Sequence, residues 1–243
     1  MVGGEEVPAW FTMVGSSVHN MIDDHLSNRP VLPAEQYFYP LVSSAMEVEP
    51  DLKVWLSGGS KDDPIVGDKA LQMVKDCYDR ALEALSEIDV WDVEYDASGT
   101  LAGCPTPIKA FVDVIGEHKK HGPVIVDWKT SSKKPTSNLQ LEVYNALLEA
   151  GRYRDNEHKF KGLYVMLRPG VPKARPATLL GGSERAVGMK FKETLDRMTA
   201  GPHEAIQGFM CDYCFQKFNC LAYSGPTPRA LYYNVEDIDV FPF

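Results

Sequence analysis

The sequence predicts a single α/β or α+β domain, built on a mixed central sheet with helices on its faces. Apolar residues recur at helical spacing in the N-terminal third, short apolar runs follow in the middle, and helical spacing returns before one more apolar run. An order of helix, three strands, helix and strand is typical of a mixed sheet flanked by helices. We therefore expect one domain over residues 1–243, with a cysteine-rich segment at 205–223 packed on it.

The composition is that of an ordinary globular protein. Hydrophobic residues make up 44% of the chain and charged residues 24%, which argues against long disorder. No apolar run approaches the roughly 20 residues that a membrane-spanning helix needs. The first residues lack the basic and apolar regions of a secretory signal, so we expect a cytoplasmic protein.

Two helices are expected in the N-terminal third. Residues 15–26 place apolar side chains at three- and four-residue steps, and Ser16 or Ser17 would cap the start of this helix. Residues 67–87 show the same spacing over a longer stretch. The segment between them, residues 30–66, mixes aromatic residues with proline and glycine and has no clear assignment.

The spacing of apolar residues then changes to that of strands. Strands are expected at Val90–Tyr95, Ile108–Ile115 and Val124–Asp127, separated by connections that contain glycine and proline. The remaining expected elements are a helix at Asn138–Ala150, a strand at Gly162–Leu167 and a surface helix at Glu184–Met198.

Three charged residues stand in or at the end of the two apolar strands in the middle of the chain. Asp113 lies within IKAFVDVIG. Asp127 ends the apolar run in VIVDWKT, and Lys129 follows it by two residues. Side chains two residues apart point to one face of a strand, and a neighbouring strand could bring Asp113 beside Asp127. Crowded carboxylates repel one another unless a cation lies between them, and their hard oxygens suit Mg²⁺ or Mn²⁺. A lysine beside such an ion can orient water and stabilise charge on a phosphate, although an isolated D-x-K more often simply faces solvent.

The net charge of −9 disfavours a nucleic-acid partner, because phosphate binding is driven by lysine and arginine. Metal-binding carboxylates add to an acidic total, however, and a local basic track can still hold DNA. The expected track lies near the proposed site in the sequence and consists of Lys119, Lys120, Lys129, Lys133 and Lys134.

The order of these residues resembles the PD-(D/E)XK nuclease superfamily, and within it the RecB-like exonucleases, including the CRISPR-associated and phage members. In that family a strand-borne Asp precedes a hairpin and a D-x-K strand, which would make Asp113, Asp127 and Lys129 the core of the catalytic site. The next helix carries Q-x-x-x-Y, and Gln140 and Tyr144 match it, one helical turn apart. The resemblance implies a restriction-endonuclease-like fold in which these two residues orient the catalytic lysine or contact DNA.

The family also has an N-terminal G-x-x-x-H motif, which Gly15 and His19 match. The resemblance makes His19 a further metal ligand, with Asp23 one turn later as a supporting acidic residue. An imidazole ligand favours Mn²⁺ relative to an all-oxygen site, and Mg²⁺ is the other expected ion. Glu94, near the end of the strand before Asp113, is another acidic neighbour. A lone histidine is more often structural, and the order of the motifs along one chain is what favours the functional interpretation.

Three of the five cysteines cluster near the C-terminus as Cys211, Cys214 and Cys220. Thiolates at this spacing can share one metal centre. In the RecB-like iron–sulfur nucleases, three such cysteines and one far upstream hold a 4Fe–4S cluster that fastens the chain ends around the nuclease core. The resemblance therefore implies a 4Fe–4S cluster, with zinc on the three cysteines and His203 as the alternative.

The fourth ligand of such a cluster has no counterpart in the family's position, because no cysteine precedes His19. Cys77 falls on the apolar face of a predicted helix and is expected to be a buried thiol. Cys104, in the loop LAGCPTP, is expected to be exposed enough to act as a ligand. The cluster could use Cys104, lack a protein ligand or be absent.

The resemblance implies a metal-dependent deoxyribonuclease, in the first instance an exonuclease of DNA processing, recombination or phage DNA metabolism. DNA is the expected partner, together with recombination or replication proteins, in the cytoplasm of a bacterial or phage-infected cell. One alternative is a non-catalytic module on the same fold that binds DNA or a partner protein. Another is a metalloprotein whose cysteine cluster is the functional centre.

Overall fold

The computed structural model of the chain describes residues 10–48, 65–135, 137–153, 159–172, 178–180 and 182–200. These residues group into two compact units. The described part of the first unit is residues 10–21, 31–48 and 65–75, and the second unit holds residues 22–30 and the described residues from 76 to 200. The expectation of a single nuclease domain over residues 1–243 stays a prediction.

The first unit is helical in the part that the structure describes. Helices α1 (Trp10–Leu26) and α4 (Ile65–Leu85) begin in this unit and continue into the second, whereas α2 (Ala34–Val48) lies wholly within it. An ion pair joins Lys75 Nζ of α4 to Glu35 Oε1 of α2 at 2.7 Å.

The start of α1 corrects the predicted N-cap. The helix begins at Trp10, so Ser16 and Ser17 both lie inside it. Ser17 is fully buried and donates a hydrogen bond from Oγ to the carbonyl of Met13 at 2.7 Å. A serine can satisfy its hydroxyl on the preceding turn of a helix, which the sequence pattern does not distinguish from a cap.

Helix α2 occupies a segment to which the sequence pattern assigned no element. The helix contains Pro40, which cannot donate a backbone hydrogen bond and is rare inside helices. Phe38 is fully buried two residues earlier. Burial of large apolar side chains therefore outweighs the low helical propensity of this segment.

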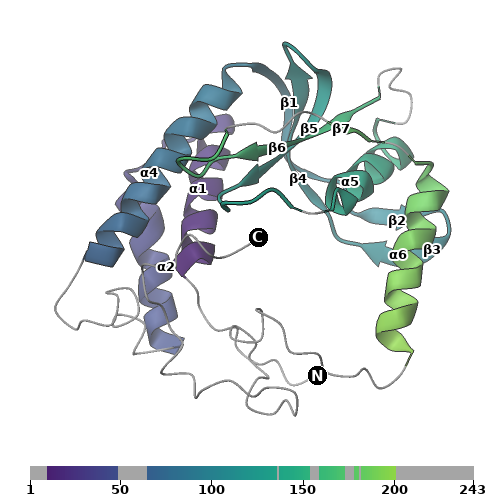
Figure 1. The fold of residues 1–243 in the computed structure, drawn as a ribbon, viewed down its shortest axis with the longest axis horizontal. Coiled ribbons are helices and arrows are strands. Elements are labelled where there is room, and N and C mark those ends of the chain that lie inside the picture. Colours follow the sequence, from purple (N-terminus) through teal and green to yellow (C-terminus); the bar gives the residue numbers. More distant parts are fainter. Residues whose placement is uncertain are drawn as a thin grey trace. The chain divides into compact units, whose positions relative to one another are not determined.

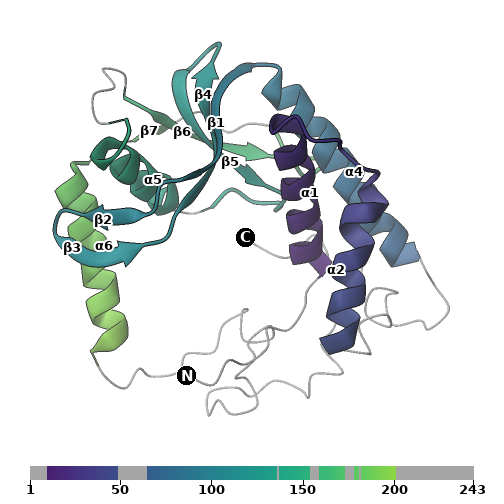
Figure 2. The ribbon, with the colours of Figure 1, turned by 180° about the vertical axis from the view of Figure 1, so that it is seen from behind.

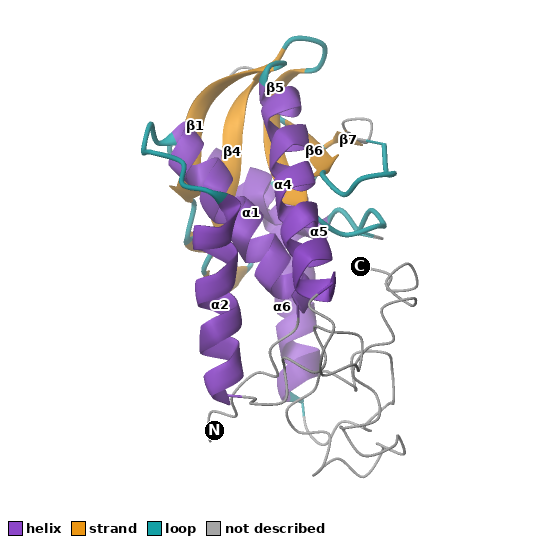
Figure 3. Cartoon of the chain, turned by 90° about the vertical axis from the view of Figure 1, so that its left-hand side faces the viewer, coloured by secondary structure: helices purple, strands orange, loops and turns teal. Residues whose placement is uncertain are grey.

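The second unit contains a five-stranded sheet with the strand order β1-β4-β5-β6-β7 (Figure 1). Its strands are β1 (Ile88–Asp96), β4 (Phe111–His118), β5 (Gly122–Lys129), β6 (Lys161–Met166) and β7 (Thr178–Leu179). The β5–β6 pair is parallel, since a helix connects these strands, and the other neighbouring pairs are antiparallel. Figure 3 shows β1, β4 and β5 as curved ribbons side by side. The predicted mixed sheet is confirmed.

A separate two-stranded sheet is formed by β2 (Gly99–Leu101) and β3 (Cys104–Ile108). The prediction of one strand over Ile108–Ile115 is therefore wrong. Ile108 ends β3, and the chain enters the main sheet only at Phe111. Apolar residues on both sides of this break give a continuous pattern, so the sequence hides the change of sheet.

Helix α6 (Glu184–Thr199) packs on the β2–β3 hairpin, as Figures 1 and 2 show from opposite sides. Ser183 caps its N-terminus by accepting a hydrogen bond from the backbone N–H of Ala186. A Cβ atom at Gly188 would lie 2.4 Å from the carbonyl oxygen of Ala102, so glycine is required for this close approach.

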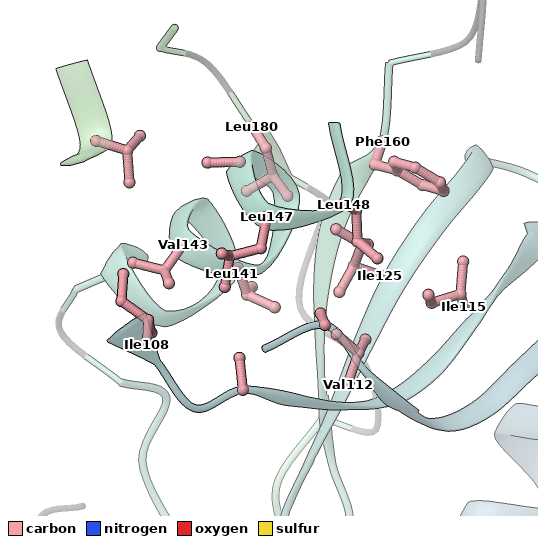
Figure 4. Close-up of a cluster of buried hydrophobic side chains, with 14 of the residues drawn as sticks. Ile108, Val112, Ile115, Ile125, Leu141, Val143, Leu147, Leu148, Phe160 and Leu180 are labelled. Carbon is pink, nitrogen blue, oxygen red and sulfur yellow. The ribbon is translucent and has the colours of Figure 1, made fainter. Parts of the chain in front are cut away.

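The core of the second unit lies between the sheet and helix α5 (Leu139–Ala150). Figure 4 shows Leu141 and Leu148 of α5 pointing toward Ile125 of the sheet. A Cβ atom at Gly162 on β6 would lie 2.7 Å from Leu141 Cδ1, which shows how closely the helix approaches the strand. Each fully buried leucine or isoleucine contributes about 1.5–3 kcal/mol to folding.

The other predicted elements are confirmed with small shifts at their ends. The observed elements are β1, β5, β6, α4, α5 and α6. Among the described residues, no helix combines the length and the apolar character needed to cross a bilayer. The cysteine-rich segment at 205–223 lies outside the residues that the structure describes.

Candidate active site

A row of polar side chains crosses the sheet from β4 to β6. The pairing of Val114 with Val126 places the next residues, Asp113 and Asp127, opposite each other on adjacent strands. Residues that are opposite in an antiparallel pair share one face of the sheet, so both carboxylates project to the same side. On the other side of β5, Asp127 pairs with Tyr164 of β6. The juxtaposition expected from the sequence agrees with this register.

Glu94 extends the row onto β1. The pairing of β1 with β4 places Glu94 opposite Asp113, and a carboxylate oxygen of each lies within 4.8 Å of the other. Glu94 has a φ of 44°, in the left-handed region that residues other than glycine seldom adopt. The resulting cluster of hard oxygen donors fits Mg²⁺ or Mn²⁺, because a cation between these carboxylates would remove their mutual repulsion.

The pKa of Asp113 is shifted by its surroundings. Burial raises the pKa of its carboxyl to about 6. Two influences oppose this shift: the backbone N–H of Trp128 donates a hydrogen bond to Asp113 Oδ2 at 2.9 Å, and the charge of Lys129 also lowers the pKa. A bound cation would favour the ionised carboxylate in the same way.

Lys129 is held by residues from β5, α5 and β6. Its Nζ forms an ion pair with Asp127 Oδ2 at 2.6 Å and donates a hydrogen bond to Gln140 Oε1 at 3.3 Å. Gln140 Nε2 in turn donates to the hydroxyl oxygen of Tyr144 at 2.9 Å. Burial raises the pKa of Tyr144, and the hydrogen bond from Gln140 lowers it. Gln140 thus contacts the lysine directly, and Tyr144 contacts Gln140 from behind it.

The ring of Tyr164 contacts the ammonium group of Lys129. Its ring centroid lies 5.9 Å from Lys129 Nζ and 5.6 Å from Lys134 Nζ, and its hydroxyl donates to the carbonyl of Ser137 at 3.1 Å. Burial, followed by the charge of Asp127, raises the pKa of Tyr164 to about 12, so the phenol is neutral at pH 7. The sequence offers one hint of this residue, a hydroxyl-bearing ring inside the apolar run GLYVML.

Glu94, Asp113 and Asp127 form a carboxylate row, and Asp127 and Gln140 anchor Lys129 beside it. A sequence model of the PD-(D/E)XK nuclease superfamily matches residues 5–220. The chain belongs to the PD-(D/E)XK nuclease superfamily. Curated proteins give no match. Members of this superfamily are metal-dependent nucleases, and the mixed sheet flanked by helices is their restriction-endonuclease-like fold.

The basic residues of this PD-(D/E)XK chain do not form the continuous track expected from the sequence. Lys119 and Lys120 lie in the β4–β5 connection, whereas Lys129 ends β5, roughly 20 Å away along the strand. Lys119 is engaged locally, since it donates to the carbonyl of Ser86 at 2.7 Å. Of the expected track, Lys134 is brought to the ring beneath Lys129. These lysines are close in sequence but far apart in space, because the turn of a hairpin is distant from the far ends of its strands.

The residues of the superfamily's N-terminal motif lie on α1. His19 is half-buried in the part of α1 that belongs to the first unit. Asp23 lies in the second unit, where its Oδ2 forms an ion pair with Arg29 Nη2 at 2.6 Å and its Oδ1 accepts a hydrogen bond from Ser27. The assignment of His19 as a metal ligand stays a prediction.

The expectation that Cys104 is an exposed ligand is wrong. The residue begins β3, pairs with Leu101 in the hairpin under α6, and is fully buried. Cys77 is fully buried as predicted, and burial raises the pKa of its thiol to about 12. The predicted cluster residues Cys211, Cys214 and Cys220, together with His203, lie outside the described residues.

Proposed function

We propose that this chain is a Mg²⁺- or Mn²⁺-dependent deoxyribonuclease of the RecB-like type, acting as an exonuclease in DNA processing, recombination or phage DNA metabolism. The observation that supports it is the row of Glu94, Asp113 and Asp127 beside Lys129, whose ammonium group is anchored by Asp127 and Gln140. Oxygen ligands for a divalent cation and a fixed donor for a phosphate are the groups that phosphodiester hydrolysis requires.

The metal ligands in this proposal come from the carboxylate row. Asp113 and Asp127 supply the central oxygen ligands, and Glu94 supplies an additional one. His19 is proposed as a nitrogen ligand from its G-x-x-x-H motif. A nitrogen donor among oxygens shifts preference from Mg²⁺ toward Mn²⁺.

The residues of the chain divide the remaining work of hydrolysis. A bound divalent cation supplies an activated water and neutralises charge on the phosphate. Lys129 donates a hydrogen bond to the attacking water or to a phosphate oxygen, and Asp127 and Gln140 fix the direction of that donor. The water gives up one proton to solvent as its oxygen forms a bond to phosphorus, one phosphoester bond breaks, and the departing oxygen takes up a proton from solvent.

Cleavage of end-labelled DNA by the purified full-length chain tests the proposal. Linear single- and double-stranded DNA and RNA of the same sequence are incubated with Mg²⁺, with Mn²⁺ and with EDTA. We expect metal-dependent cleavage of DNA that Asp127→Ala and Lys129→Gln each lower by at least about 100-fold. His19→Ala should lower it more in Mn²⁺ than in Mg²⁺, because the variant loses the nitrogen ligand that favours Mn²⁺.

A surface variant provides the matched control for these losses. Lys192→Gln removes a lysine of α6 that forms an ion pair with Asp196 at 2.5 Å, and its activity should equal that of wild type. Binding of DNA without any metal-dependent cleavage would instead support the non-catalytic module. Resistance of circular DNA where linear DNA is degraded is expected of an exonuclease, and rapid cutting of circles would contradict that part.

The C-terminal cysteines are proposed to hold a structural 4Fe–4S cluster, with zinc as the alternative. The spacing Cys211-x2-Cys214-x5-Cys220 supports a shared metal centre. Iron, sulfide and zinc analysis of protein purified without oxygen distinguishes an iron–sulfur cluster from a zinc ion. Absence of all three, with folding unchanged in Cys214→Ser, would remove this part of the proposal.

A further inference from the structure

We propose that Lys134, seated on the ring of Tyr164, binds the substrate's phosphate backbone beside the catalytic lysine, an inference that rests on the proposed nuclease function. Lys134 is then a substrate-binding residue and Tyr164 a positioning residue. The ligand is a phosphodiester next to the one that is cleaved.

One buried ring contacts two ammonium groups. Tyr164 is 2% exposed, and the Nζ atoms of Lys129 and Lys134 lie 5.9 and 5.6 Å from its ring centroid. Contacts at this distance are attractive by about 0.5–1 kcal/mol at exposed sites and more when they are desolvated. Two like charges gathered at one ring create a local positive potential that attracts an anion.

Hydrogen bonds hold the chain both before and after Lys134. Ser131 Oγ donates to the carbonyl of Lys133 at 2.9 Å, which closes the turn before Lys134. After it, the carbonyl of Ser137 accepts the hydroxyl of Tyr164 at 3.1 Å. Tyr164 therefore contacts this loop twice, through its ring face and through its hydroxyl. A lysine presented in this way loses less conformational entropy when it binds a phosphate.

The charges of the two lysines are compensated differently. Lys129 forms an ion pair with Asp127 at 2.6 Å. Among the ion pairs between described residues, none includes Lys134. The charge of Lys129 is thus largely balanced within the protein, whereas that of Lys134 is available to a substrate anion.

The neighbouring Lys133 provides a matched control. It carries the same charge one residue earlier and is exposed, and the cation–π contacts of the described residues do not include it. A general effect of net charge on DNA binding would be the same for both lysines. An effect of the cation–π contact with Tyr164 would appear for Lys134 alone.

Equilibrium binding of a fluorescein-labelled DNA oligonucleotide to the full chain in EDTA measures the contact directly. Fluorescence anisotropy is recorded from 50 to 200 mM KCl for wild type, Lys134→Gln, Lys134→Arg and Lys133→Gln. We expect Lys134→Gln to weaken binding about three- to tenfold and to lower the slope of log Kd against log salt by about 1. Lys134→Arg should retain the affinity, and Lys133→Gln should change it less than about twofold.

Variants of Tyr164 test the positioning role. Tyr164→Phe keeps the ring but removes the hydroxyl that donates to the carbonyl of Ser137, so it should weaken binding less than Lys134→Gln does. Tyr164→Leu removes the ring and should weaken binding as much as Lys134→Gln, with no further loss in the double variant. Thermal melting shows whether Tyr164→Leu is folded at the assay temperature, and the Lys134 variants decide the question if it is not.

Cleavage kinetics separate this inference from the nuclease proposal. Lys134→Gln should raise KM about three- to tenfold with kcat nearly unchanged, whereas Lys129→Gln lowers kcat. Equal binding and KM for Lys134→Gln and Lys133→Gln would overturn the role of Lys134 even if wild type is an active nuclease. If wild type cleaves no better than Asp127→Ala, the nuclease proposal itself fails.

Discussion

The carboxyl of Asp113 destabilises the fold when it is ionised, because burial raises its pKa to about 6 from an ordinary value of 3.8. Between these two pH values the folded chain holds a proton that the unfolded chain has lost. The free energy of unfolding therefore falls as pH rises through this window and stays lower above it. A divalent cation bound at the carboxylate row would restore the lost stability at neutral pH.

Asp113→Asn tests this conflict between stability and metal binding. The amide keeps an acceptor for the Trp128 N–H and removes the buried charge, so in EDTA at pH 7.5 the variant should be more stable than wild type by about 1–3 kcal/mol. The difference should shrink as pH falls toward 4. Urea denaturation at several pH values measures it. Adding Mn²⁺ should stabilise wild type and leave the variant unchanged; a variant less stable than wild type in EDTA would contradict this account.

The hydrogen bonds behind Lys129 should also matter unequally. Gln140→Ala removes the carbonyl that accepts from Lys129, and kcat should fall about 10- to 100-fold with KM little changed. Tyr144→Phe removes only the support behind Gln140 and should lower kcat less than tenfold. Steady-state kinetics on a labelled oligonucleotide measure both. Fully additive losses in the double variant would indicate that the two side chains act independently.

At the level of secondary structure, the site depends on how closely α5 lies against the sheet. Gln140 lies in the first turn of the helix that covers the core, so any change in the distance of that helix from the sheet moves the partner of Lys129. Gly162 permits the short distance between α5 and β6, because a Cβ atom at position 162 would lie 2.7 Å from Leu141 Cδ1. The glycine of β6 thereby connects core packing to the geometry of the catalytic lysine.

Gly162→Ala should therefore reduce activity more than its effect on stability explains. Overpacking of this kind destabilises by about 1–3 kcal/mol, and Leu141, whose Cβ would lie 3.2 Å from the added methyl group, must shift to accept it. Cleavage at a temperature where the variant is fully folded separates the two effects. Gly99→Ala is the control, because its nearest neighbour, Leu147 Cδ2, is 3.6 Å from the added Cβ and the substitution should be tolerated. Equal activity of both variants would show that α5 need not be held so closely.

Across the whole molecule, the sequence predicts what depends on local spacing and misses what depends on packing. The mixed sheet, α4, α5 and the shared face of Asp127 and Lys129 follow from periodicity, and the structure shows them. Helix α2 contains a proline and owes its existence to burial, so propensity gave no signal.

The candidate site shows the same difference between what local spacing predicts and what packing determines. The aspartates on adjacent strands could be predicted because strand pairing brings them together. Tyr164 comes from a parallel strand beyond a helix, and only the register of β5 with β6 places its ring beneath Lys129. The predicted exposure of Cys104 failed for a related reason, since α6 covers the hairpin that contains it.

The burial of both described cysteines gives a test of the packing as a whole. Cys77 and Cys104 are free thiols at 0% exposure, and burial raises the pKa of Cys77 to about 12, so neither should react with iodoacetamide in the native protein. Both should react in urea. Mass spectrometry of tryptic peptides after a short exposure to reagent reads each cysteine separately. Rapid native labelling of Cys104 would show that the hairpin opens under α6.

The left-handed backbone of Glu94 has a consequence for self-association. Among the described residues β1 is an edge strand of the main sheet, and an unpaired edge is a template for pairing with another chain. A residue at a φ of 44° interrupts the regular backbone of that edge, and its negative charge opposes a second strand. Glu94→Val, which favours an extended backbone, should therefore lower metal affinity and also promote aggregation, measurable by light scattering in the presence of EDTA. The acid that completes the carboxylate row would then also help to keep the protein monodisperse.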